Sequence, residues 1–265
     1  MNHDKGATLG TIDWHAPWLT RYAALGESAA QQVLAGTTVA QAFNGLIAQG
    51  AAPDPGVRFV AQQDLPASMA YELFILERAQ VPTRDNLHDF FNALMWLYWP
   101  QAKRRMNQLH AAVVQAQGVG ARRGPVRDAL TVLDENGALL LAPQALQAAL
   151  QARQWQQAFV VLRPLWQQAQ LLIVGHALLE KLVHPRKAIT AHIYSVPCAP
   201  ENAALSDAVL AGALQAQSLA EKPFFPLPVL GIPGWCAQNA NFCFYDDSVV
   251  FRPPAVLENL RVRPR

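Results

Sequence analysis

Hydrophobic positions recur at helical spacing along most of the chain. They predict helices at about 28–34, 38–49, 83–99, 100–117, 143–154, 155–183 and 207–219. Thr37 or Thr38 is suited to capping the second of these, and Thr83 to capping the third. Pro100 predicts a break or kink, because proline cannot donate the backbone hydrogen bond of a helix interior.

Shorter apolar segments predict a few strands. Alternation indicates one strand at 57–60, with others at 192–196 and 248–251, while 71–77 is ambiguous between strand and helix. Two apolar runs, 129–133 and 138–141, are joined through Asp134-Glu135-Asn136-Gly137, and Asn-Gly between such runs predicts a β-hairpin. Many helices with a few short strands, including this hairpin, indicate a predominantly helical α+β fold.

The domain organisation is predicted to be simple. The sequence shows no internal repeat and no linker, so residues 1–265 are expected to form a single domain. Residues 1–17 are expected to be an N-terminal arm anchored by apolar side chains such as Ile12, Trp14 and Trp18. The proline-rich and aromatic stretch 223–265 is expected to wrap around the core.

Composition narrows the class of protein. Charged residues make up 15% of the 265 residues, and the formal net charge is +2. Because nucleic-acid-binding proteins usually carry a strongly basic surface, the sequence does not predict binding to nucleic acid. The three cysteines form no Cys-x-x-Cys pair, and no apolar signal core follows Met1. The most apolar stretches, 90–99 and 171–179, are shorter than the roughly 20 residues of a membrane helix. A cytoplasmic protein without a membrane segment is therefore predicted.

The first candidate site lies on the helix predicted to begin at Thr83. Asp85, His88, Asp89 and Asn92 would share one face at about 3.6 residues per turn, and Trp96 continues that stripe. Short polar side chains beside a tryptophan are typical of a pocket wall. The alternative is that these side chains cap or tie neighbouring loops to the helix.

The second candidate is a histidine and a carboxylate four residues apart. His176 and Glu180 fall on one helical face that otherwise carries apolar residues, so both need polar partners. A carboxylate-oriented histidine can act as a base or a metal ligand. The alternative is a buried structural hydrogen-bond pair, and the sequence assigns no particular metal or cofactor.

The third candidate is a basic loop. Arg122, Arg123 and Arg127 stand close together, with Asp128 next to the last of them, and Arg84 lies beside the first candidate site. Guanidinium groups bind carboxylates and phosphates with two parallel hydrogen bonds, so a small anionic ligand is a candidate partner. The same arginines could instead pair with the carboxylates of the two candidate helices.

Four groups of motifs resemble a known bacterial family. The first is Val81-Pro82-Thr83-Arg84-Asp85-Asn86-Leu87-His88-Asp89, and the second combines residues 122–125, 127–131 and 134–137. The third is Gly175-His176-Ala177-Leu178-Leu179-Glu180-Lys181, and the fourth combines residues 231–235, 245–247 and 250–253. The family is the domain of unknown function family 3025, and the resemblance spans nearly the whole chain. It implies one domain but no particular activity.

Two functions follow as hypotheses. One is a module that binds a small molecule or peptide; the other is a hydrolase, metal-assisted in one version, acting on a phosphate-bearing or other anionic substrate. The predicted catalytic residues are Asp85, His88, Asp89, His176 and Glu180, and the predicted substrate-binding residues are Arg84, Asn92, Trp96, Arg122, Arg123, Arg127 and Asp128.

A specific arrangement of these residues is predicted. The helix from Thr83 and a helix from Trp166 are expected to pack side by side, since both offer long apolar faces. His176 and Glu180 are expected to be shielded and to face the polar stripe of the first helix. An arginine from the 122–127 loop is expected to balance the carboxylates.

Overall fold

The computed structural model describes residues 9–118, 124–194 and 205–253. It shows a mixed α+β architecture in which helices predominate, as the sequence predicts. Among the described residues, no helix has both the length and the apolar character needed to cross a bilayer. The expectation of a single domain over 1–265 stays a prediction.

Two small sheets form the β structure. The larger has the order β4-β3-β5-β6, in which β3 pairs antiparallel with β4 and parallel with β5, and β5 pairs antiparallel with β6. The smaller is a parallel pair of β1 and β2. The strands are β1 (Arg58–Ala61), β2 (Gln80–Thr83), β3 (Gly137–Leu141), β4 (Gln170–Ile173), β5 (Thr190–Tyr194) and β6 (Phe224–Pro228).

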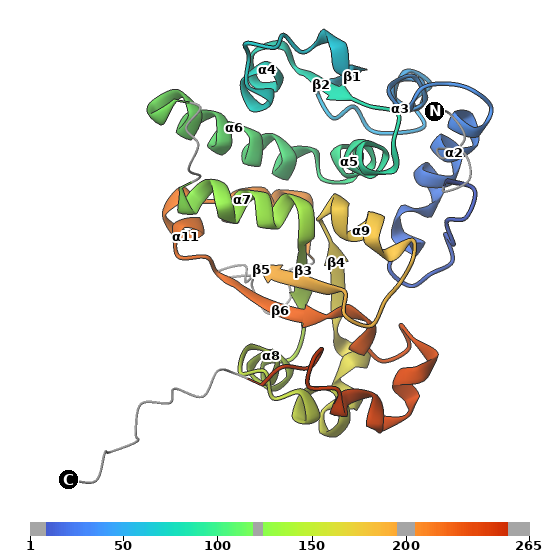
Figure 1. Ribbon diagram of the computed structural model, residues 1–265, viewed down its shortest axis with the longest axis vertical. Helices are drawn as coiled ribbons and strands as arrows, with labels where there is room; N and C mark the ends of the chain where they lie inside the picture. Colours follow the sequence, from blue (N-terminus) through green and yellow to red (C-terminus); the bar gives the residue numbers. More distant parts are fainter. Residues whose placement is uncertain (1–8, 119–123, 195–204, 254–265) are drawn as a thin grey trace.

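The helices are arranged in layers above the larger sheet (Figure 1). Helices α7 and α9 lie on that sheet, α5 and α6 form the next layer, and α4 with the smaller sheet lies beyond them. The α-helices are α2 (Ala23–Leu34), α3 (Val39–Ala48), α4 (Tyr71–Arg78), α5 (Leu87–Tyr98), α6 (Pro100–Gln117), α7 (Pro125–Asn136), α8 (Gln144–Gln151), α9 (His176–Leu182), α10 (Asp207–Ala213) and α11 (Ala216–Ala220).

Helix α5 begins later than the sequence predicts. Thr83 ends β2, and its hydroxyl donates a hydrogen bond to the carbonyl of Val81 instead of capping a helix. Asn86 is the N-cap, since its side chain accepts a 2.7 Å hydrogen bond from the backbone N–H of Asp89. The predicted start was wrong because pairing with β1 keeps Thr83 extended.

The predicted break at Pro100 is confirmed and turns the chain sharply. Trp99 has φ −129° and ψ 48°, so α5 ends at Tyr98 and α6 starts afresh at Pro100. The N-terminal end of α6 is tied to the start of α10: the carboxylate of Asp207 accepts hydrogen bonds of 2.8 Å from the N–H groups of Gln101 and Ala102. Because the chain turns at Trp99, α5 and α6 are separate helices whose side chains line the same part of the protein interior.

The hairpin predicted between 129 and 141 is wrong. Residues 129–136 belong to α7, which starts at Pro125, and β3 begins directly at Gly137. The buried positions Ala129, Leu130 and Leu133 fit helical spacing, and their burial against the core outweighs the local turn signal of Asn-Gly.

The helices predicted over 155–183, with Pro164 at a helix start or kink, are found only in part, because a strand interrupts them. The segment contains a π-helical turn at Gln157–Val161, a 3-10 helix at Arg163–Gln168, β4 and then α9. No helix begins at Trp166, because the apolar run that follows pairs with β3. Only the last part of the segment, α9, packs against α5.

The two ends of the described chain cover the core with aromatic side chains. Ile12, Trp14 and Trp18 are buried, as predicted for anchors of the N-terminal arm. In the C-terminal stretch, Phe251 packs with Trp155, and the indole of Trp155 donates a hydrogen bond to the carbonyl of Arg252. The strand predicted at 248–251 is wrong: a turn is found there.

Gly175 allows α9 to start against the end of α7. A Cβ at this position would lie 2.5 Å from the carbonyl oxygen of Glu135, a backbone atom that cannot move aside cheaply. We expect Gly175→Ala to lower the free energy of unfolding by about 1–3 kcal/mol through overpacking. Chemical denaturation measures this, and Gly212→Ala is the control.

Gly212 lies inside α10 with open space around its missing Cβ. Alanine there should stabilise the protein by about 0.5–1 kcal/mol. Equal effects of the two substitutions would contradict the close approach of α7 and α9.

Candidate functional site

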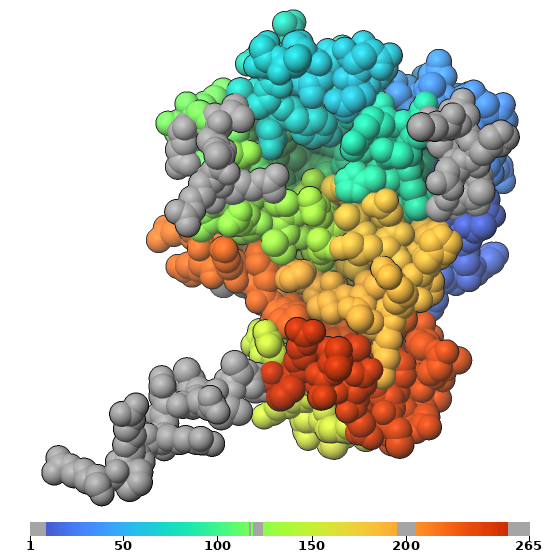
Figure 2. Space-filling model, in the orientation of Figure 1, coloured from blue at the N-terminus to red at the C-terminus, as the bar shows by residue number. Residues whose placement is uncertain are grey.

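A cavity of about 560 Å³ lies between α4 and β2 on one side and α5, α6, α7 and the start of α9 on the other. Figure 2 shows the surface hollowed between the teal segments and the green segments. Its wall is formed by Gln62, Leu65, Tyr71, Glu72, Ile75, Pro82, Arg84, His88, Asp89, Asn92, Trp96, Lys103, Met106, Asn107, His110, Thr131, Asp134, Glu135 and His176.

A buried ammonium group stands at the inner wall of this cavity. Lys103 is 4% exposed, and its Nζ donates to Asp134 Oδ1 at 2.5 Å and to Asn92 Oδ1 at 2.8 Å. The ammonium also lies 5.5 Å from the ring centre of Trp96. Burial raises the pKa of Asp134, but Lys103 and His176 outweigh that effect and leave the pKa below its usual value. Lys103 and Asp134 thus form an ion pair in which the lysine is buried and the aspartate side chain is 29% exposed.

The corner at Trp99 makes this contact possible. Asn92 and Lys103 are 11 residues apart, and in one continuous helix that separation would place them roughly 16 Å apart along the axis. Because the chain turns at Trp99, their side chains meet instead.

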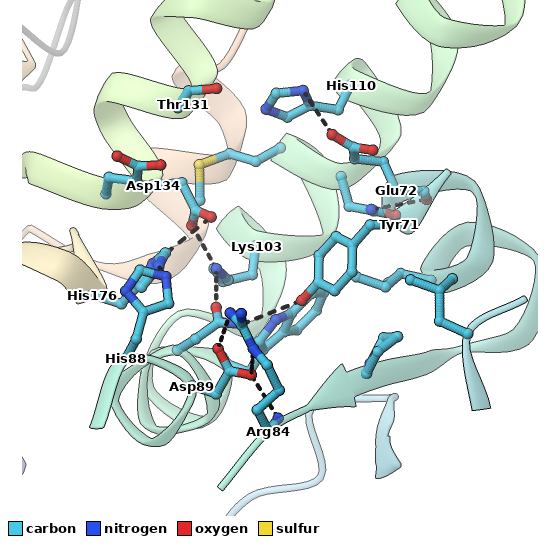
Figure 3. A pocket seen from close by; sticks show the side chains of 18 of the residues that line it. Tyr71, Glu72, Arg84, His88, Asp89, Lys103, His110, Thr131, Asp134 and His176 are labelled. Carbon is cyan, nitrogen blue, oxygen red and sulfur yellow. Dashed lines mark hydrogen bonds and ion pairs between the residues drawn. The ribbon is translucent and has the colours of Figure 1, made fainter. Parts of the chain in front are cut away.

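Two histidines form a second polar group on the wall (Figure 3). His88 Nδ1 lies 2.8 Å from Glu180 Oε2, and His88 Nε2 lies 2.9 Å from His176 Nε2. The far nitrogen of His176 faces Asp134, at 3.9 Å from Oδ2. Glu180, His88, His176 and Asp134 therefore follow one another in a chain that has a partly exposed carboxylate at each end.

The two imidazoles have opposite protonation preferences. The hydrogen bond from Glu180 raises the pKa of His88 above its usual value, although partial burial opposes it. Burial lowers the pKa of His176 to about 4, against the attraction of Asp134. When the pair takes up one proton, His88 therefore holds it, and the neutral His176 can accept the N–H of His88.

Asp89 and Arg84 close the end of the cavity near β2. Asp89 is buried and accepts hydrogen bonds from the backbone N–H of Arg84 at 2.6 Å, from its Nε at 3.0 Å and from its Nη2 at 3.0 Å. This bidentate pair fixes the turn between β2 and α5. Both residues line the cavity as predicted, and the alternative of tying a loop to the helix is observed as well.

A third polar group lies at the opposite end. Glu72 Oε1 is 3.8 Å from both Arg127 Nη2 and His110 Nδ1. Arg127 is a predicted site residue, but it stands behind Glu72 and does not line the cavity.

Several predicted site residues lie elsewhere. Asp85 precedes α5 and accepts a 2.9 Å hydrogen bond from the N–H of Val39 at the start of α3. Asp128 is exposed and pairs with Lys222 at 3.6 Å. Arg122 and Arg123 lie outside the described residues. Trp96 and Asn92 do line the cavity.

The predicted cluster is partly correct. His176 is buried and faces His88, as expected, but Glu180 is 35% exposed and contacts His88 instead of His176. The cation observed beside Asp134 is Lys103, and Arg127 contacts Glu72; whether Arg122 or Arg123 balances the carboxylates stays a prediction, since both lie outside the described residues. No sequence motif singles out Lys103. Its helical spacing to Asn107 and His110 could have indicated a polar face on α6.

The histidines alone do not make a metal site. Within the described ranges, no group of three or more His, Cys, Asp or Glu side chains is placed to hold a metal ion. A metal at this wall would have two imidazole nitrogens, His88 Nε2 and His176 Nε2, and would need further ligands from water or substrate.

The comparisons with known proteins identify a family. The sequence profile described as "Protein of unknown function (DUF3025)" matches residues 57–255, nearly the whole chain. The chain belongs to the DUF3025 family. No curated protein and no solved structure matches it. The matched region of this DUF3025 protein contains every residue that lines the cavity.

The Glu180–His88 pair predicts a pH-dependent contribution to stability. Because the pKa of His88 is raised in the folded protein, the stabilisation is complete below the unfolded value of about 6.5 and is lost as pH rises through the folded pKa. We expect Glu180→Gln to cost about 0.5–1 kcal/mol at mildly acidic pH, as for partly exposed pairs, and less at alkaline pH.

Chemical denaturation at both pH values and an NMR titration of His88 would measure the effect. Glu221→Gln removes an exposed carboxylate elsewhere and serves as control. A titration of His88 that is the same in Glu180→Gln and in the unsubstituted protein would contradict the pair.

Proposed function

We propose that this DUF3025 protein binds a small polar molecule in the cavity. The observation that carries the proposal is the convergence of buried or partly buried charged groups on a space large enough for a ligand. Burying Lys103, Asp89 and His176 is costly, and replacing such groups by apolar side chains is often neutral or stabilising. Their contribution to folding therefore does not explain why these groups are buried, whereas binding a ligand would.

The walls also supply the mixture that small-molecule sites have. Trp96, Met106 and Ile75 offer apolar contact, while Asn92, Asn107 and Tyr71 offer directional hydrogen bonds. The binding of a peptide receives less support, because the polar groups are gathered inside a cavity and not along an extended groove.

Thermal stability in the presence of single metabolites from a polar library tests the proposal. A ligand at 100 times its Kd stabilises the folded state by about 2.7 kcal/mol, which raises Tm by several degrees. We expect such a shift with the unsubstituted protein and its loss in Thr131→Trp, which places an indole in the cavity wall.

Ala148→Trp adds the same side chain at an exposed position of α8 and should leave the shift intact. If every compound that stabilises the protein also stabilises Thr131→Trp equally, the cavity is not the binding site. The absence of any stabilising compound would also count against the proposal.

A second candidate function is hydrolysis of a phosphate-bearing or other anionic substrate. The observation that favours it is the Glu180–His88–His176 chain, in which a carboxylate orients an imidazole on the cavity wall. Such an imidazole can act as a general base for an attacking water or as a general acid for a leaving group. In the metal-assisted version, the two Nε2 atoms would hold the metal in place of their mutual contact.

Assays with p-nitrophenyl esters and phosphates, with and without added Zn²⁺, Mn²⁺ or Mg²⁺, test this candidate. His88→Gln should lower any turnover by about 10²–10⁴-fold if His88 transfers protons. Elemental analysis of the purified protein checks the metal version, for which a stoichiometric divalent metal is expected. Turnover that survives His88→Gln unchanged would contradict the assignment.

A further inference from the structure

The hydrogen bonds around Asn92 have a fixed direction. The ammonium of Lys103 can only donate, so the atom of Asn92 that it contacts must be the amide oxygen. The amide nitrogen of Asn92 is then the end that faces Tyr71, and it donates to Tyr71 Oη at 3.3 Å. A chain of donation thus runs from Lys103 through Asn92 to Tyr71.

The chain ends on a hydroxyl that still has its own proton to donate. Burial raises the pKa of Tyr71, so the phenol stays protonated at neutral pH. Tyr71 lines the cavity, and the described part of the chain offers its O–H no acceptor. Figure 3 shows the ring of Tyr71 reaching from α4 with its hydroxyl toward Arg84 and α5.

Two cationic side chains lie around the same point. Lys103 uses two of its three N–H groups on Asp134 and Asn92, and Arg84 uses Nε and Nη2 on Asp89. Each keeps at least one further N–H group. The Arg84 side chain is 57% exposed, so water can accept from its remaining N–H groups. Lys103 is buried, and buried donors are nearly always paired in folded proteins, so its remaining N–H group and the O–H of Tyr71 are the donors that call for an acceptor in the cavity.

The carboxylates nearby do not fill that role. Asp134 and Asp89 already accept from Lys103 and Arg84. Glu72 is directed toward His110, away from the hydroxyl of Tyr71 (Figure 3). The fourth carboxylate of the wall, Glu135, is at the C-terminal end of α7, whereas Tyr71 starts α4.

We propose that the cavity binds its ligand through an oxygen acceptor, a carboxylate or amide carbonyl group, which accepts hydrogen bonds from Tyr71 Oη and from the adjacent donors of Asn92, Lys103 and Arg84. This inference rests on the proposed ligand-binding function and names the chemistry of one end of the ligand. It also makes Tyr71 a binding residue, which the sequence motifs do not reveal.

The oppositely charged alternative is a ligand that enters with an ammonium group. The wall carries four carboxylates, Glu72, Asp89, Asp134 and Glu135, against the cations Arg84 and Lys103, which taken as a sum would favour a cation. The donors near Tyr71 nevertheless disfavour an ammonium group at that end of the cavity. An ammonium group would leave the hydroxyl proton of Tyr71 unpaired and would face the positive charges of Lys103 and Arg84.

The test uses three small probes of similar size. Sodium acetate, acetamide and methylammonium chloride are titrated into ¹⁵N-labelled full-length protein, and the side-chain amide signal of Asn92 and the backbone amide of Tyr71 are followed. We expect saturable shifts with acetate, acetamide or both, and none with methylammonium. Stronger binding of acetate than of acetamide identifies a carboxylate, and the reverse identifies a carbonyl.

Two tyrosine variants give the residue-specific control. Tyr71→Phe removes only the hydroxyl and should weaken binding of the oxygen probe about tenfold. Tyr98→Phe removes a hydroxyl that does not line the cavity and should leave binding unchanged. Binding of methylammonium alone, no saturable shift with either oxygen probe, or equal acetate binding by Tyr71→Phe would each overturn the inference.

The probe titration and the metabolite screen test different claims and can fail independently. If metabolites bind in the cavity but both oxygen probes fail, ligand binding stands and the oxygen-acceptor inference falls. If no metabolite acts through the cavity while acetate binds as expected, the donor site stands and the broader function fails.

Discussion

The ion pair of Lys103 with Asp134 is the contact on which the rest of the site depends. It buries a charge at the meeting point of α5, α6 and α7, and it directs the amide of Asn92 and, through that amide, the hydroxyl of Tyr71. It also holds a negative charge beside His176, which is neutral because it is buried. Removing one member of such a pair leaves an uncompensated charge, which is far more damaging than removing both.

The sequence predicts the elements of this protein better than it predicts their contacts. Helical spacing located α3, α5, α6 and α8 to within a few residues. Of the two threonines predicted to cap α3, Thr38 is the N-cap, in a capping box with Gln41. The predicted hairpin was wrong, and the helices predicted over 155–183 missed β4, because short apolar runs suit a strand and a buried helix equally. The pairing of β3 with β4 and β5 decides which of these runs are strands, and no local sequence pattern contains that information.

The candidate site shows the same limit. His88, Asp89, Asn92 and His176 were predicted from residue type and spacing within single helices, and all four line the cavity. Lys103 and Tyr71 were missed because their importance comes from neighbours 11 and 21 residues away from Asn92 in sequence. Asp85 was predicted on the polar face of the helix, but α5 begins three to four residues later than predicted, so Asp85 lies before the helix. Residues that act through contacts between helices cannot be found from one helix at a time.

The corner at Trp99 and Pro100 sets the rotation of α6 relative to α5. Lys103, Asn107 and His110 all reach the cavity from one face of α6, and that face is aligned by the length of the connection before it. One residue inserted there would turn the whole face by about 100° and withdraw three polar side chains together. An insertion or deletion at this point would therefore mark a relative with a different cavity.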